Sequence, residues 1–316
     1  MFIYDFEKPI YEIERRIDDL KKLAGKKGMD ISKEIRMLEK KKDELIKEKF
    51  SHLSIEEVVK IARHPSRPYT LDYIERIAVD FIELHGDRRF ADDRAMVTGL
   101  AKIDDFKVAI IGHQKGKNTK ENLRRNFGMA HPEGYRKALR VMKLAEKFKL
   151  SVVTLIDTPG AYPGVGAEER GQAEAIATNL YEMAGLRVPI VVVVTGEGGS
   201  GGALGIGVGD KVGMLSHAFY SVISPEGCSS ILWRDAEHTK EAAKAMRITA
   251  RDLYEVGVID EIIEEPVGGA HRNYDEMARR VKAFIVKTLS ELVPLTEEEI
   301  LENRWKKIRK MTTQFL

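Results

Sequence analysis

Three apolar runs in this 316-residue chain each lead directly into a turn that contains glycine. Their sequences are IIGHQKG (110–116), LIDTPGAYPG (155–164) and VVTGEGGSGGALG (193–205). Short apolar runs bounded by Gly and Pro are typical of buried strands. Buried strands that alternate with helices predict an α/β fold, in which helices cover a sheet. Glycine at the strand ends also allows another backbone or a ligand to approach closely.

The strands between residues 90 and 270 are expected in pairs, with a helix after each pair. Strands are predicted at 95–103, 106–112, 151–157, 189–195, 211–215, 218–223 and 258–264, and helices at 133–148 and 168–185. Asp104-Asp105, between the first two strands, is a predicted hairpin turn. This order favours a repeated ββα spiral over a doubly wound sheet.

Helical patterns flank this region on both sides. Two apolar stripes with helical spacing predict an antiparallel hairpin over residues 8–50, with the turn at 24–30. Residues 273–316 return to helix, and Thr296-x-x-Glu299 has the pattern of a capping box. We therefore expect an N-terminal helical hairpin or docking region at 1–65, the main domain at 66–270 and a C-terminal helical region at 271–316.

The composition excludes several classes of protein. The 52 basic and 50 acidic residues give a net charge of +2, which does not favour nucleic acid or an anionic membrane as the main partner. The longest aliphatic stretch, 190–194, is far shorter than the ~20 residues of a membrane span. The first ten residues lack the apolar core of a secretory signal, so a cytoplasmic protein is expected. The single cysteine and the lack of an H-x-x-x-H pair predict no metal on this chain.

Two nucleotide-binding motifs are present only in part. Asp157-Thr158-Pro159-Gly160 is the kind of turn with which a GTPase senses its γ-phosphate, but the loop at 112–118 has a short spacer and no hydroxyl after its lysine. Residues 196–201 satisfy G-x-G-x-x-G, but the further glycines after them do not suit the ordinary helix of a dinucleotide-binding fold. Neither a GTPase nor a dinucleotide-binding enzyme is favoured.

The glycines of 196–205 instead suggest a site built from backbone amides. The first N–H groups of a helix have no partner inside the helix. Where no side chains intervene, two such amides can reach one oxygen and stabilise a developing negative charge, as an oxyanion hole does. The alternative is that the glycines simply admit a neighbouring strand.

A series of longer motifs resembles one known family along nearly the whole chain. The motifs are RPYTLDYI (67–74), GDRRFADDRAM (86–96), GHQKG (112–116), RRNFGM (124–129), PEGYRKALR (132–140), DTPGAYPGVGAEERGQ (157–172), GEGGSGGALGIGVGDKV (196–212) and SVISPEGC (221–228). Together they resemble the α subunit of the carboxyltransferase component of bacterial acetyl-CoA carboxylase. Ala130 departs from the pattern, because proline is expected after NFGM.

The resemblance implies a crotonase-like ββα spiral and a biotin-dependent transferase. Family members move the carboxyl group from carboxybiotin, held on the biotin carboxyl carrier protein, to acetyl-CoA, giving malonyl-CoA in the first committed step of fatty acid synthesis. The α subunit pairs with a zinc-ribbon β subunit as α2β2 and works together with biotin carboxylase. It is active only with the β subunit, and no membrane is involved. Since this chain has one cysteine, it cannot carry the zinc ribbon.

The resemblance also assigns roles to particular residues. The backbone amides of Gly201 and Gly202 are expected to form the oxyanion hole for the ureido oxygen of biotin. Substrate binding is expected at Gly198, Gly199, Gly160, Gly164, Lys115 and Lys117. The two lysines belong to a basic stretch that could attract the phosphates of CoA, or could be a solvated loop.

Several alternatives remain open at this point. The fold could be kept by a binding or scaffold protein without catalysis, or the enzyme could be a decarboxylase or a propionyl-CoA carboxylase type. Cys228 is expected to be a packed thiol rather than a nucleophile, and Asp157 is expected to cap local amides without a catalytic role.

Overall fold

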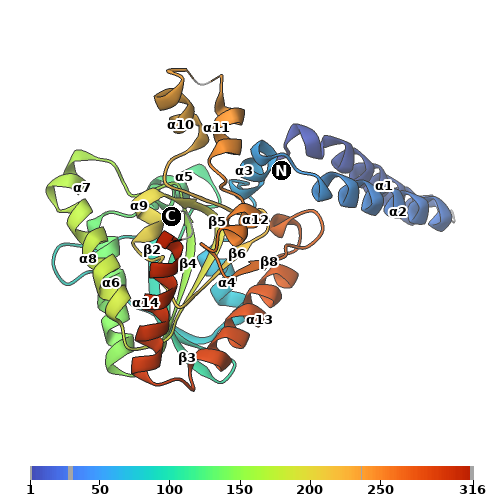
Figure 1. The fold of residues 1–316 in the computed structure, drawn as a ribbon. Coiled ribbons are helices and arrows are strands. Elements are labelled where there is room, and N and C mark those ends of the chain that lie inside the picture. The colour runs from blue at the N-terminus through green and yellow to red at the C-terminus, as the bar shows by residue number, and fades with distance from the viewer. Residues whose placement is uncertain (1, 28–30, 236, 314–316) are drawn as a thin grey trace.

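A computed structural model describes residues 2–27, 31–235 and 237–313. Its centre is a single eight-stranded sheet flanked by helices (Figure 1). The strands are β1 (Val79–Glu83), β2 (Met96–Ile103), β3 (Phe106–His113), β4 (Ser151–Thr158), β5 (Ile190–Gly199), β6 (Lys211–Leu215), β7 (Phe219–Ser221) and β8 (Glu261–Ile263). Their order is β1-β2-β3-β4-β5-β6-β8, and β7 pairs with β5.

The helices account for most of the remaining described residues. They are α1 (Lys8–Lys27), α2 (Ser32–Ser51), α3 (Ile55–Ala62), α4 (Thr70–Ile77), α5 (Thr119–Arg124), α6 (Pro132–Lys147), α7 (Val165–Glu169), α8 (Gln172–Gly185), α9 (Ser200–Leu204), α10 (Pro225–Leu232), α11 (Thr239–Ala245), α12 (Ala250–Glu255), α13 (Tyr274–Leu292) and α14 (Glu297–Thr313), with short 3₁₀ turns η1 (Asp5–Glu7), η2 (Asn126–Gly128) and η3 (Ala270–Arg272). In Figure 1, α6, α8 and α14 lie on one side of the sheet, and α4 and α13 lie on the other.

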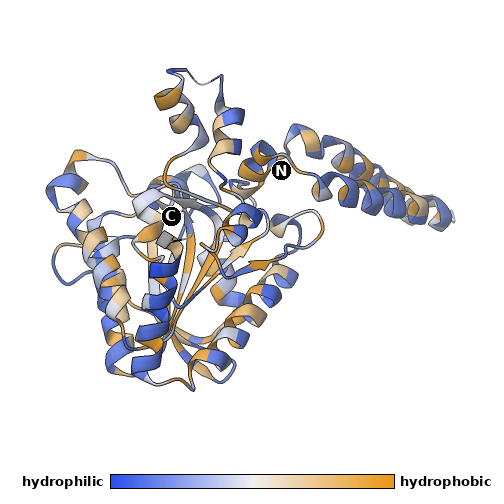
Figure 2. Ribbon diagram, in the orientation of Figure 1, coloured by the Kyte–Doolittle hydropathy of each residue, from blue (hydrophilic) through white to orange (hydrophobic). Residues whose placement is uncertain are grey.

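The direction of the strands places three glycine-bearing turns at one edge of the sheet. β2 and β3 form an antiparallel hairpin whose turn includes Asp104, which has a positive φ of 49°. β3, β4, β5, β6 and β8 then run parallel. Because the carboxyl ends of parallel strands meet at the same edge, the turns after β3, β4 and β5 come together. Strands β4 and β5 are buried along their whole length. Figure 2 shows that the strands of the sheet are largely hydrophobic.

The predicted α/β fold is confirmed, with local differences. Strand β1 was not predicted, and β7 and β8 are shorter than the predicted strands at 218–223 and 258–264. The helix predicted at 168–185 is divided into α7 and α8 by Gly171, whose φ is +81°. The strand predicted to end at residue 195 continues through the glycines to Gly199, because its last residues pair with β7. The helix that begins after them, α9, spans only five residues.

The predicted N-terminal hairpin is present as α1 and α2, which lie side by side and extend away from the body (Figure 1). An ion pair joins Lys21 to Glu39 across the hairpin at 2.9 Å. The turn was predicted at 24–30, but α1 continues through Lys27, so the prediction was wrong for residues 24–27. Residues 28–30 lie outside the described residues. At the base of the hairpin, Arg272 binds Glu14 at 2.8 Å, so the hairpin contacts the segment just before α13.

The C-terminal helix α14 is attached to the body by a buried arginine. The Arg304 guanidinium binds both carboxylate oxygens of Asp210 at 2.8 Å. It also donates to the carbonyls of Met183, Leu186 and Val188. This side chain therefore joins α14 to the end of α8 and to the loop before β6. The domain boundaries proposed from the sequence stay predictions.

Candidate active site

The turns after β4 and β5 pack backbone against backbone. A Cβ atom placed on Gly199 would lie 2.2 Å from the carbonyl oxygen of Pro159. A Cβ atom on Gly202 would lie 2.3 Å from the carbonyl carbon of Gly160. No side chain fits at such distances, so Gly199 and Gly202 permit the contact between the two turns. The close packing fixes the start of α9 against the loop at 160–164.

A cavity of about 520 Å³ opens over these two turns. It is lined by Gly160, Ala161, Tyr162, Pro163, Gly164, Glu168, Gln172, Ala173, Ile176, Ser200, Gly201 and Gly202. A Cβ atom on Gly201 would meet only methyl groups of Ile176, at 3.8 and 3.9 Å. The backbone of Gly201 thus faces the cavity, whereas Gly202 is buried against the neighbouring turn.

Four of the predicted site glycines line this cavity, and two lie next to it. Gly160, Gly164, Gly201 and Gly202 are in the lining. Gly198 and Gly199 belong to the last residues of β5, immediately before α9. A Cβ atom on Gly198 would lie 2.8 Å from the ring of Tyr220, so this glycine admits β7 rather than the cavity. Their roles in substrate binding stay predictions.

The amides of Gly201 and Gly202 lie in the first turn of α9, where N–H groups have no partner inside the helix. Among the described residues, neither amide donates to a backbone acceptor in a turn or cap. Because α9 has only five residues, its dipole is small, and the two amides themselves are the donors available to a ligand.

A second cavity of about 520 Å³ lies on the other side of α9. Its lining is mostly apolar. The lining residues are Ser200, Leu204, Tyr220, Ser221, Val222, Ile223, Cys228, Met246, Ile248, Leu253 and Val258. Cys228 is half-buried in this wall, and no histidine lines the cavity. The two cavities share Ser200.

Two buried side chains support α9 from below. The Tyr135 hydroxyl of α6 donates to the carbonyl of Gly202 at 3.3 Å. The Asn179 amide of α8 donates to the carbonyl of Gly205 at 2.9 Å and to that of Tyr135 at 3.1 Å. Neither residue was singled out in the sequence, because both lie in the interior of helices whose pattern indicates only packing. The polar residue in the apolar stripe of each helix is the signal that could have found them.

His113, at the end of β3, is fully buried beneath the same turns. Neither ring nitrogen has a hydrogen-bond partner of good geometry among the described residues, although the ring lies next to the backbone of Gly202. Burial, and then the Lys115 cation nearby, lower the pKa of His113 to about 3. The imidazole is therefore neutral at physiological pH, and its burial beneath the turns could not be predicted from the motif GHQKG alone.

Lys115 is held in a chain of charges beside the site. Its ammonium lies 2.6 Å from the Asp157 carboxylate and 3.6 Å from that of Glu197. Glu197 in turn accepts hydrogen bonds from Arg63, at 2.7 and 2.9 Å. Asp157 also accepts the backbone N–H of Glu197 at 3.0 Å, so it caps a local amide as expected.

Lys117 also has partners within the protein. Its ammonium lies 2.6 Å from the Asp72 carboxylate and donates to the hydroxyl of Tyr274 at 3.0 Å. It also lies over the rings of Tyr69 and Tyr274. The binding of CoA phosphates by Lys115 and Lys117 stays a prediction, and it would require both ammonium groups to exchange these partners.

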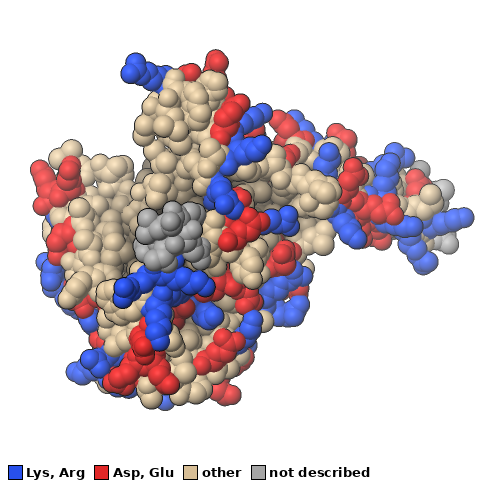
Figure 3. Space-filling model, in the orientation of Figure 1, with Lys and Arg blue, Asp and Glu red and all other residues tan. Residues whose placement is uncertain are grey.

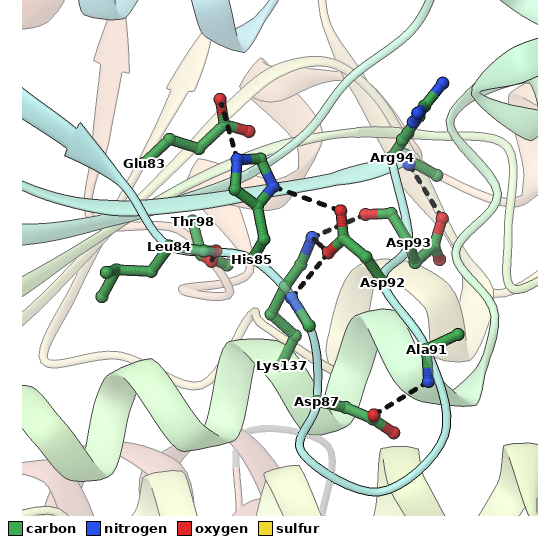
Figure 4. A network of polar contacts seen from close by, with 12 residues as sticks. Glu83, Leu84, His85, Asp87, Ala91, Asp92, Asp93, Arg94, Thr98 and Lys137 are labelled. Atoms are coloured by element: carbon green, nitrogen blue, oxygen red, sulfur yellow. Dashed lines mark hydrogen bonds and ion pairs between the residues drawn. The ribbon is translucent and has the colours of Figure 1, made fainter.

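The segment GDRRFADDRAM forms a loop that a buried lysine holds in place (Figure 4). The Lys137 ammonium binds the Asp92 carboxylate at 2.6 Å and the carbonyl of Asp93 at 2.7 Å. Burial raises the pKa of Asp92, but the hydrogen bond and charge of Lys137 outweigh it and bring the pKa to about 2. On the same loop, Asp87 accepts three backbone N–H groups, those of Arg89, Phe90 and Ala91.

The loop in turn supports the wall of the first cavity. The Asp93 carboxylate accepts the backbone N–H of His131 at 2.7 Å, and the His131 ring stacks on Tyr162. The carbonyl of Ala130 accepts the N–H of Tyr162 at 3.0 Å and the Gln172 amide at 2.8 Å. Ala130 is fully buried, so the residue that departs from the family pattern still anchors the turn through its backbone.

A separate cluster of possible ligands lies at the base of the hairpin. Glu7, His64 and His271 bring their side-chain donor atoms within 4.8 Å of one another. Because these residues are far apart in sequence, spacing could not reveal them. The backbone N–H of Ser66 donates to His64 Nδ1 at 3.1 Å, so the proton of the neutral ring is on Nε2, which faces Glu7. Arg272 adds a positive charge 3.8 Å from Glu7, and both features disfavour a bound cation.

Comparisons with known proteins agree with this architecture. A family model described as acetyl co-enzyme A carboxylase carboxyltransferase-like matches residues 3–312. The chain belongs to this family. It is 55% identical over 308 residues to the acetyl-coenzyme A carboxylase carboxyl transferase subunit alpha of Geobacter metallireducens, covering 98% of this chain and 96% of that one. It is 57% identical over 304 residues to the protein of that name from Haemophilus influenzae, with 96% of each chain covered.

Solved structures share the fold at low sequence identity. A chain of transcarboxylase 12S superposes with a TM-score of 0.61 at 20% identity, covering 76% of this chain and 44% of that one. A chain of a Pseudomonas malonate decarboxylase hetero-tetramer superposes with a TM-score of 0.60 at 15% identity, covering 78% of this chain and 98% of that one. These likenesses confirm the crotonase-like fold. Among the described residues, no helix is long and apolar enough to cross a membrane.

Proposed function

We propose that this chain is the α subunit of an acetyl-CoA carboxylase carboxyltransferase. It transfers a carboxyl group from biotin on a separate carrier protein to acetyl-CoA, and the product is malonyl-CoA, the precursor for fatty acid synthesis. Identity above 50% to α subunits over nearly the full chain carries this proposal. The cavity over two interlocked glycine turns is the supporting observation from the structure.

The first cavity suits the ureido group of biotin. That group is flat and uncharged before transfer and needs hydrogen-bond donors at its carbonyl oxygen. The cavity wall at Gly201 carries no side chain. In the turns and caps of the described residues, the N–H groups of Gly201 and Gly202 donate to no backbone carbonyl. When bound, biotin supplies the labile nitrogen–carboxyl bond. The amides of Gly201 and Gly202 bind the oxygen and stabilise the charge that develops there.

The rest of the chain keeps these amides in place. Tyr135 and Asn179 hold the carbonyls on α9, and the turn at 160–164 packs against Gly202. Positioning and electrostatics therefore account for the contribution of this chain, and no side-chain nucleophile is needed.

The chain works with a β subunit in this proposal, as the name "subunit alpha" of its relatives implies. An apolar surface supports such a partner. Val222, Ile231, Leu232 and Trp233 are 39–76% exposed around α10, where Figure 3 shows few charged side chains. Several large apolar side chains exposed on one element commonly mark a protein interface. An α2β2 assembly with the carrier protein and biotin carboxylase as further partners belongs to the proposal, as does a cytoplasmic location.

Reconstitution tests the function directly. The chain is mixed with its β subunit, free biotin and malonyl-CoA, and acetyl-CoA formation is followed. We expect acetyl-CoA only when both chains and biotin are present. Formation without biotin would indicate a decarboxylase, and no formation with any β subunit would support a non-catalytic scaffold.

A further inference from the structure

Ser200 lies between the two cavities and lines both of them. It follows Gly199, the last residue of β5, and begins α9. Of the residues that line the two cavities beside α9, Ser200 is the one they share. On one side of it lie the amides of Gly201 and Gly202, and on the other lies the apolar wall that includes Leu204.

The backbone at Ser200 has a conformation that favours glycine. Its φ is +52°, in the left-handed region that non-glycine residues seldom adopt. Its four nearest neighbours, Gly198, Gly199, Gly201 and Gly202, are all glycine. A glycine would adopt this conformation without strain, so the serine side chain is present at a conformational cost. Strain of this kind is concentrated at functional sites.

The Ser200 hydroxyl is available to a ligand. The residue is exposed, and among the described side chains no hydrogen bond engages its hydroxyl. The serine hydroxyls at 221 and 224, which lie near the second cavity, are instead bonded to backbone groups. A free hydroxyl in the lining of the first cavity can reach a group that is bound there.

We propose that the Ser200 hydroxyl binds the carboxylate that is transferred, by donating a hydrogen bond to one of its oxygens. This inference rests on the proposed function, in which the first cavity accommodates the carboxylated biotin. No bond to serine forms or breaks, and the hydroxyl keeps its proton. Ser200 thus contacts the carboxylate both before transfer and in malonyl-CoA.

The test compares two ligands that differ by the carboxylate. Malonyl-CoA and acetyl-CoA binding to the complex of this chain and its β subunit is measured by titration calorimetry, for wild type, Ser200→Ala and Ser200→Gly. A hydrogen bond to a charged group is worth about tenfold or more in affinity. We expect both variants to bind malonyl-CoA at least about tenfold more weakly and acetyl-CoA as wild type does. We expect kcat/KM for carboxyl transfer from malonyl-CoA to fall by about the same factor in both, because a contact made before and after transfer acts on binding.

Thermal unfolding separates the hydroxyl from the backbone. Ser200→Gly relieves the left-handed strain and should raise the melting temperature, whereas Ser200→Ala keeps that strain. A more stable but less active Ser200→Gly variant would support the proposal. Ser290→Ala, an exposed position on α13 far along the chain, is the matched control and should leave binding and turnover unchanged.

Two results would overturn the inference. Equal malonyl-CoA affinity in wild type and both variants would show that the hydroxyl does not bind the carboxylate. An equal loss for acetyl-CoA and malonyl-CoA would show a general effect on the site. If the wild-type complex transferred no carboxyl group from malonyl-CoA to biotin, the proposed function itself would fail, and this inference with it.

Discussion

At the scale of single residues, the structure separates two glycines that the sequence places side by side. Gly202 is packed against the backbone of Gly160, whereas Gly201 faces the cavity. A side chain at Gly202 must displace the turn at 160–164, so its effect on activity cannot be told apart from damage to the fold. A side chain at Gly201 meets only Ile176 at ordinary contact distance. Gly201 is therefore the position at which the role of the amides can be tested.

We predict that Gly201→Ala lowers turnover by about 10²-fold or more while the protein stays folded, because a methyl group in the cavity moves the bound oxygen away from its donors. Gly202→Ala should lower both turnover and the melting temperature, since its Cβ would lie 2.3 Å from a backbone carbon. For both variants, turnover is measured by steady-state kinetics of the αβ complex and the melting temperature by thermal unfolding of the chain. Near-normal turnover in Gly201→Ala would mean that the glycines serve packing alone.

The sequence could identify these glycines but not their supports. Consecutive glycines after a buried strand indicated close approach somewhere in the segment 196–205, and the family resemblance then singled out Gly201 and Gly202. Tyr135 and Asn179 stand out as polar residues in apolar helical stripes, but their role, like that of His113, could not be predicted. It depends on which helix and strand pack beneath α9. The partners of Lys115 and Lys117 were missed for the same reason: Asp157 and Asp72 lie about 40 residues away from them in sequence.

At the scale of elements, the strands were easier to predict than the ends of the glycine-rich segment. Apolar runs in the sequence predicted the ends of β2, β3, β4 and β6 to within a residue or two of those observed. The end of β5 was placed four residues too early, because its glycines have low strand propensity. Pairing with β7, which sequence alone does not show, extends the strand. Tertiary contacts decided the structure where local propensity was weak.

The loop at 86–96 and helix α6 provide a test of such tertiary support. Lys137 is 1% exposed and binds groups on that loop, whereas Lys143, on the same helix, is 42% exposed. We predict that Lys137→Met lowers the free energy of unfolding by about 1–3 kcal/mol, because the buried carbonyl of Asp93 loses its donor and Asp92 is left with its contacts with Gly86 and His85. The control Lys143→Met should change it by less than about 1 kcal/mol.

Urea unfolding of the two methionine variants measures the difference. The Lys137 variant should also lose turnover, since Asp93 and His131 connect this loop to Tyr162 in the cavity wall. If both variants unfolded at the same urea concentration as wild type, Lys137 would not hold the loop in the way its contacts indicate.

At the scale of the whole molecule, the hairpin is joined to the body by titratable groups. Glu7 precedes α1, His64 follows α3 and His271 lies in η3, so three distant segments meet there. The His64 and His271 rings stack at 4.1 Å, and His271 Nε2 lies 3.1 Å from Glu7. Tyr4, Arg67 and Arg272 complete the charged and polar surroundings. The attachment of the hairpin should therefore depend on pH.

The direction of the pH dependence follows from the shifted pKa values of His64 and Glu7. Burial, and then the charge on His271, lower the pKa of His64 to about 4, below its ordinary value of 6.5. Between pH 6.5 and 4 the unfolded chain therefore binds a proton that the folded chain excludes, and stability falls as pH is lowered. Burial raises the pKa of Glu7, but His271 and the Tyr4 amide outweigh it, and the pKa is lowered overall. The stability contributed by Glu7 is lost at still lower pH, in the same direction.

We predict that the melting temperature of wild type falls between pH 7.5 and pH 5.0, and that His64→Gln reduces this fall because glutamine does not titrate. His52→Gln is the control, since His52 is exposed at the end of α2 and should leave the fall unchanged. The comparison uses the difference between the two pH values, so a constant loss of stability in His64→Gln does not affect it. An equal fall in wild type and His64→Gln would show that His64 remains free to protonate in the folded chain, and the buried junction would then not be what couples the hairpin to pH.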